Sequence, residues 1–143
     1  MKEQDWQDLL GRGNDYFGQG NWLRAQSFYK LAFDLLSEDM QLSPDSSRIL
    51  MAWMGTCHNL AAVHECLQEF DQALNYLQIP YQRCRHLIDN HHNECELLIG
   101  LKSLNLSWSA LLLFAKNHPE FMKTQPLAQD LAHALNPSSI QLH

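Results

Sequence analysis

Residues 13–32 read GNDYFGQGNWLRAQSFYKLA and carry the clearest structural pattern in this chain of 143 residues. On both sides of the GQGN segment, apolar side chains recur every three or four positions, which is the spacing of one face of an α-helix. The two glycines of GQGN indicate a tight turn, and Asn21 is a typical N-cap for the helix that follows. The stretch therefore predicts two antiparallel helices joined by a short turn.

Small residues stand at a fixed distance within this stretch and again further along the chain. Gly13 is followed twelve positions later by Ala25, and Ala61 is followed twelve positions later by Ala73. In both copies an aromatic ring stands three positions before the second small residue. A small residue lets two helices approach closely, so we expect Ala25 and Ala73 to be buried where helices cross.

This arrangement resembles the tetratricopeptide repeat (TPR), in which small residues and aromatic side chains alternate between paired helices. The residues that carry the resemblance are Gly13, Tyr16, Gly20, Asn21, Trp22, Ala25, Tyr29 and Ala32 in one copy and Leu60, Ala61, His64, Phe70, Ala73 and Leu77 in the other. The resemblance implies an all-α fold of antiparallel helix pairs in a short right-handed array, closed by a C-terminal capping helix. As a whole, the chain is similar to small, uncharacterised bacterial TPR-like proteins.

The periodicity predicts about six helices in one domain that covers residues 1–136, with residues 137–143 as a tail. The expected helices cover approximately residues 6–17, 22–36, 44–67, 70–88, 93–117 and 125–135. Residues 37–47 are polar and are expected to form the main loop, with Ser43 as an N-cap and Pro44 at the first helical position. Pro80 falls inside the fourth helix and is expected to kink it.

The composition excludes several functional classes. Sixteen acids against ten Lys and Arg residues give a formal charge of −6, without the basic face that nucleic-acid binding needs. The four cysteines lack the spacing of a zinc knuckle or a redox pair, and the first ten residues lack the pattern of a secretory signal. We therefore expect free thiols and a cytoplasmic protein. Residues 97–115 are the most apolar stretch but include Lys102 and Asn105, so we expect a buried helix of a soluble protein and no membrane span.

In TPR proteins the first helix of each pair lines a concave groove, and asparagines there bind the backbone of an extended peptide. Asn14 and Asn59 occupy matching places, and a carboxamide offers both a donor and an acceptor. The candidate groove residues are Gln7, Asn14, Phe17, His58, Asn59 and Glu65. Leu10 stands where chaperone-binding TPRs have a lysine, so a carboxylate clamp is not expected. The alternative is that both asparagines form ordinary hydrogen bonds on or between helices.

Residues 93–117 are expected to form a helix that is apolar on two nearly opposite faces. One face carries Leu97, Leu101, Leu104, Trp108, Leu111 and Leu112, and the other carries Ile99, Leu106, Ala110 and Leu113. Six helices are too few to cover both faces, since the helix at residues 125–135 can cover only one. Ile99, Leu106 and Leu113 are therefore the candidate interface of a homodimer.

The segment HHNECE at residues 91–96 is the only candidate for metal binding. His91 and Cys95 are four apart, as are His92 and Glu96, so each pair could chelate zinc from one helix face. The alternative is a polar turn between two helices. No glycine-rich phosphate loop, nucleophile elbow or metal-hydrolase helix is present, so neither an enzyme nor a cofactor is expected.

These patterns together favour a non-enzymatic adaptor or chaperone-like module that binds a peptide or a partner helix of an unidentified protein. The alternatives are a homodimeric scaffold that associates through the helix at residues 93–117, and a Cys/His metal-binding protein.

Overall fold

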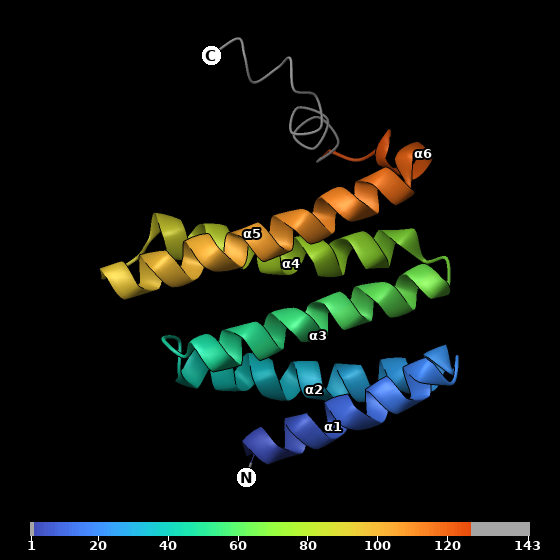
Figure 1. Ribbon diagram of the computed structural model, residues 1–143, viewed down its shortest axis with the longest axis horizontal. Coiled ribbons are helices and arrows are strands. Elements are labelled where there is room, and N and C mark those ends of the chain that lie inside the picture. The colour runs from blue at the N-terminus through green and yellow to red at the C-terminus, as the bar shows by residue number, and fades with distance from the viewer. Residues whose placement is uncertain (1, 127–143) are drawn as a thin grey trace.

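The computed structural model describes residues 2–126, which form six α-helices joined by short turns (Figure 1). The helices are α1 (Lys2–Gly18), α2 (Trp22–Leu42), α3 (Ser47–Cys66), α4 (Phe70–Asp89), α5 (Glu94–Asn117) and α6 (Pro119–Met122). The five long helices stack in chain order, and each runs antiparallel to the one before it (Figure 1). Each long helix packs mainly against its neighbours in the sequence. The prediction of an all-α fold with about six helices is confirmed.

The turn between α1 and α2 forms as the sequence predicts. Gly20 adopts a positive φ of 75°, a region that glycine enters without steric cost. The side-chain oxygen of Asn21 accepts a hydrogen bond from the backbone N–H of Arg24 at 3.3 Å and caps α2.

The connection between α2 and α3 differs from the prediction. The loop expected at residues 37–47 is only residues 43–46, because α2 continues to Leu42 and packs Leu36 and Met40 against the core. Ser43 ends α2, and its N–H donates to the carbonyl of Asp39 at 2.8 Å. The N-cap of α3 is Ser46, whose hydroxyl accepts from the N–H of Ile49 at 3.2 Å. Pro44 therefore lies in the loop and not in the first turn of α3.

Small residues lie where neighbouring helices approach most closely. Ala25 and Ala73 are fully buried, which confirms the prediction for both. Gly13 faces the ring of Tyr29, and a Cβ atom placed on Gly13 would lie 2.6 Å from Cε1 of that ring. Pro80 is buried inside α4, which continues through it as one helix.

Helix α5 is oriented differently from the prediction. Its buried residues are Gly100, Ser103, Ser107, Leu111, Phe114 and Ala115. A Cβ atom on Gly100 would lie 2.9 Å from Cγ1 of Ile88 on α4, so the small residues allow α5 to pack closely on α4. Neither of the two predicted apolar faces is the buried one, and leucines of both faces are exposed.

The C-terminal prediction falls almost wholly outside the described residues. Of the helix expected at residues 125–135, only Gln125 and Pro126 are described, and they follow α6 in a turn. The tail expected at residues 137–143 lies outside the described residues. The short helix α6 was not predicted. It begins with Pro119 at its first position, and Met122 packs into the cluster formed by α3, α4 and α5.

Candidate binding groove between α3 and α5

Helices α3 and α5 run in the same direction and are joined through α4, which pairs with both (Figure 1). One side of α3 presents residues spaced by three or four positions that are only partly covered. They are Met51, Gly55, His58, Ala62 and Glu65. The first and last of these contact α5 or the residue after it, and we call the strip of surface between these two contacts the groove between α3 and α5.

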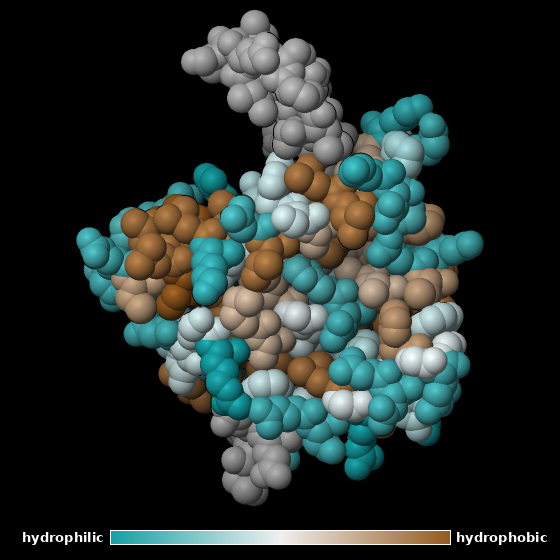
Figure 2. Space-filling model, in the orientation of Figure 1, coloured by the Kyte–Doolittle hydropathy of each residue, from teal (hydrophilic) through white to brown (hydrophobic). Residues whose placement is uncertain are grey.

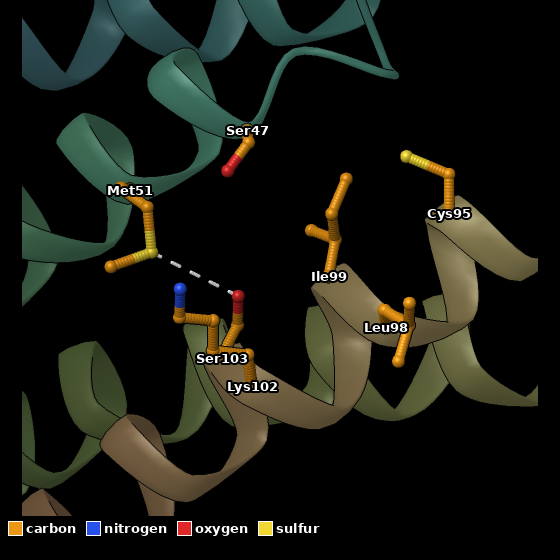
Figure 3. Close-up of a pocket in the computed structure, with 7 residues that line it drawn as sticks. All are labelled: Ser47, Met51, Cys95, Leu98, Ile99, Lys102 and Ser103. Atoms are coloured by element: carbon orange, nitrogen blue, oxygen red, sulfur yellow. Dashed lines mark hydrogen bonds between the residues drawn. The ribbon is translucent and has the colours of Figure 1, made fainter.

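The groove opens into a cleft at the N-terminal ends of both helices (Figure 3). The cleft has a volume of about 290 Å³ and is lined by Ser47, Met51, Cys95, Leu98, Ile99, Lys102 and Ser103. The hydroxyl of Ser103 contacts the sulfur of Met51 at 3.9 Å, which joins the two walls (Figure 3). Lys102 is the only charged side chain in this mainly apolar lining.

At the opposite end of the groove, a hydrogen bond joins Glu65 to His118. Oε2 of Glu65, near the end of α3, lies 2.7 Å from Nε2 of His118, the residue that follows α5. The imidazole of His118 is held in place by two aromatic rings, because its centroid lies 4.4 Å from that of Phe70 and 4.6 Å from that of Phe114. Glu65 was predicted as a ligand contact, but in the structure it ties α3 to the end of α5.

The exposed side of α5 carries a row of residues at intervals of three and four positions, which we call the leucine–lysine row. It consists of Leu98, Lys102, Leu106, Ser109, Leu113 and Lys116. The leucines are 65%, 46% and 61% exposed in chain order. Hydrophobic side chains gather over the N-terminal half of α5, where the row begins (Figure 2).

By length and composition, α5 could also cross a membrane, and 28% of its most apolar window is buried. A core helix of a soluble protein can pass the same test. The close approach of Gly100 to Ile88 on α4 shows that α5 packs on a neighbouring helix.

The groove residues predicted on α1 are largely engaged in the packing of α1 on α2. The hydroxyl of Tyr29 donates to Oδ1 of Asn14 at 2.6 Å, and the ring of Phe17 packs edge-on against Trp22 with a centroid distance of 5.0 Å. Gln7 is exposed. Asn14 therefore forms the inter-helix hydrogen bond that the alternative interpretation expected.

The residues predicted on α3 share its groove-facing side. Asn59 is half-buried and forms no side-chain hydrogen bond within residues 2–126. His58 is half-buried, and its Nε2 atom is enclosed without a hydrogen-bond partner in the same part of the chain. Burial lowers the pKa of His58 below its usual value of 6.5. His58, Asn59 and Glu65 therefore all lie on α3 and are each partly buried.

Of the predicted dimer residues, Leu106 and Leu113 belong to the exposed row, whereas Ile99 is half-buried and packs against the core cluster to which α1, α2, α3 and α4 contribute. Met51 and Lys102 were not predicted as groove residues. The three- and four-residue spacing from Leu98 to Lys116 is visible in the sequence and could have indicated this row. It was missed because the two predicted faces of this helix were defined by apolar residues alone, which left out both lysines.

Residues 91–96 form the turn and the first residues of α5. Nδ1 of His91 lies 2.7 Å from the carbonyl oxygen of Ile88, and the N–H of His92 donates to Oε1 of Glu96 at 2.9 Å. This second bond lowers the pKa of Glu96, while a hydrogen bond with Glu96 raises the pKa of Asp45 in the α2–α3 loop. The described part of the chain contains no group of three or more metal-ligating side chains.

Comparison with known proteins gives one match. A family model described as "Protein of unknown function (DUF2753)" matches residues 4–143, which is nearly the whole chain. No curated protein and no solved structure matches the chain. The family description assigns no activity.

Proposed function

The chain belongs to the DUF2753 family, and we propose that it is a non-enzymatic interaction module that binds a peptide or a partner helix in the groove between α3 and α5. The observation that carries this proposal is the exposure of Leu98, Leu106 and Leu113 in one row. Single exposed leucines are ordinary, but three on one side of one helix, beside a mainly apolar cleft, favour an interaction site. Complete burial of one leucine side chain contributes about 1.5–3 kcal/mol.

We further propose that the helices form a right-handed array of the TPR kind, with α1, α3 and α5 as the groove-lining helices. The close contact of Gly13 with Tyr29 supports this proposal, as does the burial of Ala25 and Ala73. In TPR proteins, small residues in these places permit the same close approach.

A photo-crosslinking amino acid at Leu106 tests the proposed function inside the source cell. We expect one defined crosslinked protein from this position and none from Lys30, an exposed residue of α2 outside the groove. Replacing Leu98 and Leu113 with Gln should remove the crosslink from Leu106. The same crosslinks from Leu106 and Lys30 would contradict the proposal.

Asn59 allows a second test of the same groove. If an extended peptide binds there, Asn59→Ala should lose a backbone hydrogen bond that contributes about 0.5–1.5 kcal/mol and weaken the binding about two- to twelve-fold. Asn14→Ala is less informative, because it also removes the acceptor of the Tyr29 hydroxyl. Calorimetric affinity for the crosslinked partner, with a thermal melt of each variant, separates lost binding from lost stability.

Self-association through α5 is the second candidate, favoured by the exposure of Leu106 and Leu113. Light scattering would then give twice the chain mass of 16.6 kDa. Leu106→Glu should return the monomer, because burying an unpaired carboxylate is unfavourable. A wild-type monomer throughout the micromolar range would exclude this candidate.

A further inference from the structure

The leucine–lysine row differs in charge from the rest of the protein. Residues 97–117 contain Lys102 and Lys116 and no acid, although the whole chain has a formal charge of −6. Both lysines are exposed, and neither forms an ion pair with another residue of the described part of the chain. The row is therefore apolar and locally basic, with both cations free to pair with an incoming group.

We propose that the occupant of this row is an acidic amphipathic helix, an inference that rests on the proposed function. The row from Leu98 to Lys116 covers 18 helical steps, which amounts to about 27 Å or five turns. A helix with apolar residues every three or four positions can lie along such a row. Asp or Glu residues beside its apolar face would meet Lys102 and Lys116.

The cleft adds a place for one side chain of that helix. It lies beside Leu98 and Lys102 at the start of the row and has a volume of about 290 Å³. Its walls come from α3 and α5, so a side chain that enters it contacts both helices (Figure 3). When an apolar residue of the partner helix enters the cleft, an Asp or Glu residue beside it on the same helix can reach Lys102.

The two lysines make a second copy of this chain a poorer occupant. Pairing two α5 rows would bring Lys102 and Lys116 from each copy into one interface, and residues 97–117 offer them no acid. Enclosing an unpaired ammonium group is costly, whereas a carboxylate on a different partner offsets that cost.

A lipid surface fits the same features less well. The row lies beside a cleft between two helices, into which a side chain can insert but a flat bilayer surface cannot.

Two synthetic peptides test the inference. Both are helical and carry leucines at the same positions, but one has Glu and the other has Lys beside the apolar face. We expect fluorescence anisotropy to show that the full chain binds the Glu peptide at least ten-fold more tightly. Added salt should reduce this preference, because it screens exposed charges.

Charge reversal on the protein provides the matched comparison. Lys102→Glu combined with Lys116→Glu should abolish or reverse the preference for the Glu peptide. Lys30→Glu combined with Arg85→Glu changes the net charge equally at exposed positions outside the row and should retain the preference. Circular dichroism of each variant checks that the fold is intact.

Equal affinity for both peptides, or an unchanged preference after reversal of Lys102 and Lys116, would overturn the acidic partner. So would sedimentation of the chain with phosphatidylserine vesicles without binding of the Glu peptide, or a stable homodimer that dissociates on Leu106→Glu. If Leu106 still crosslinks to a different protein in any of these cases, the interaction module stands and only the acidic partner is rejected. Loss of that crosslink together with all peptide binding would reject both.

Discussion

Gly13 illustrates how the absence of one side chain positions two helices. Its α-carbon faces the buried ring of Tyr29, whose hydroxyl is held by Asn14. Gly13→Ala would place a Cβ atom 2.6 Å from the ring, so we expect the free energy of unfolding to fall by about 1–3 kcal/mol.

Gly11, on the same helix, is the matched control because a Cβ atom there meets nothing within 4 Å. Gly11→Ala should raise the free energy of unfolding by up to about 1 kcal/mol through helix propensity. Urea denaturation measures both variants. If Gly13→Ala is also stabilising, Tyr29 moves aside and the close approach is not required.

His58 should make the stability of the protein depend on pH. Because burial lowers the pKa of His58 in the folded state, the unfolded chain binds the proton more readily once the pH falls below about 6.5. The contribution of His58 to the free energy of unfolding is therefore complete above that pH, and it decreases as the pH falls from 6.5 toward the lower pKa of the folded state.

Replacing His58 with Gln should reduce this acid sensitivity. We expect the difference in unfolding free energy between about pH 7.5 and pH 5.5 to be smaller in His58→Gln than in the wild type. His86→Gln, at an exposed histidine of α4, is the control. Identical pH profiles for His58→Gln and wild type would show that His58 is as well solvated in the folded chain as in the unfolded one.

The helices illustrate which predictions a sequence supports and where they fail. A glycine turn and a side-chain cap are local signals, so the start of α2 at Trp22 could be predicted from the sequence itself. The start of α4 at Phe70 was predicted from the spacing of apolar residues, because its N-cap Glu69 forms no side-chain cap hydrogen bond. The end of α2 was missed because Met40 is stabilised by tertiary packing that local polarity hides. The orientation of α5 was missed because close packing on α4 favours Gly100 and Ser103 over leucines.

The orientation of α5 predicts that its exposed leucines contribute little to the stability of the chain alone. Replacing Leu98, Leu106 and Leu113 together with Gln should change the melting temperature only slightly, because all three are largely solvated. Leu111→Ala, at a fully buried position of the same helix, should cost about 2–5 kcal/mol. Thermal melts by circular dichroism compare the two. A large loss in the triple variant would mean that other parts of the chain cover the row.

The candidate site could be predicted only in part, because it depends on how separate helices meet. The spacing of His58, Asn59 and Glu65 predicted a shared side of α3, and all three are partly buried on that helix. The sequence could not show that Glu65 pairs with His118, 53 positions away. It also could not show that Met51 faces Ser103, since no local pattern links α3 to α5.

We expect the folded protein to protect two of its four thiols from chemical modification. Burial raises the pKa of Cys57 to about 12 and that of Cys84 to about 11, whereas Cys66 and Cys95 are exposed. The thiolate is the reactive form, so a thiol reagent at about pH 8 should modify two cysteines in the folded chain and all four in denaturant. Mass spectrometry counts the modified groups. Rapid modification of a third thiol would mean that the array opens between α3 and α4 without unfolding.

The hydrogen bond between Glu65 and His118 gives the groove two unlike ends. It joins α3 to the end of α5 on one side, while the cleft between Ser47 and Cys95 is open on the other. We therefore expect a bound helix to continue past the cleft by any number of residues, but to stop or turn away at the contact between Glu65 and His118. The binding segment of a partner is then expected close to a chain end or a helix terminus on that side, with the rest of the partner leaving past Cys95.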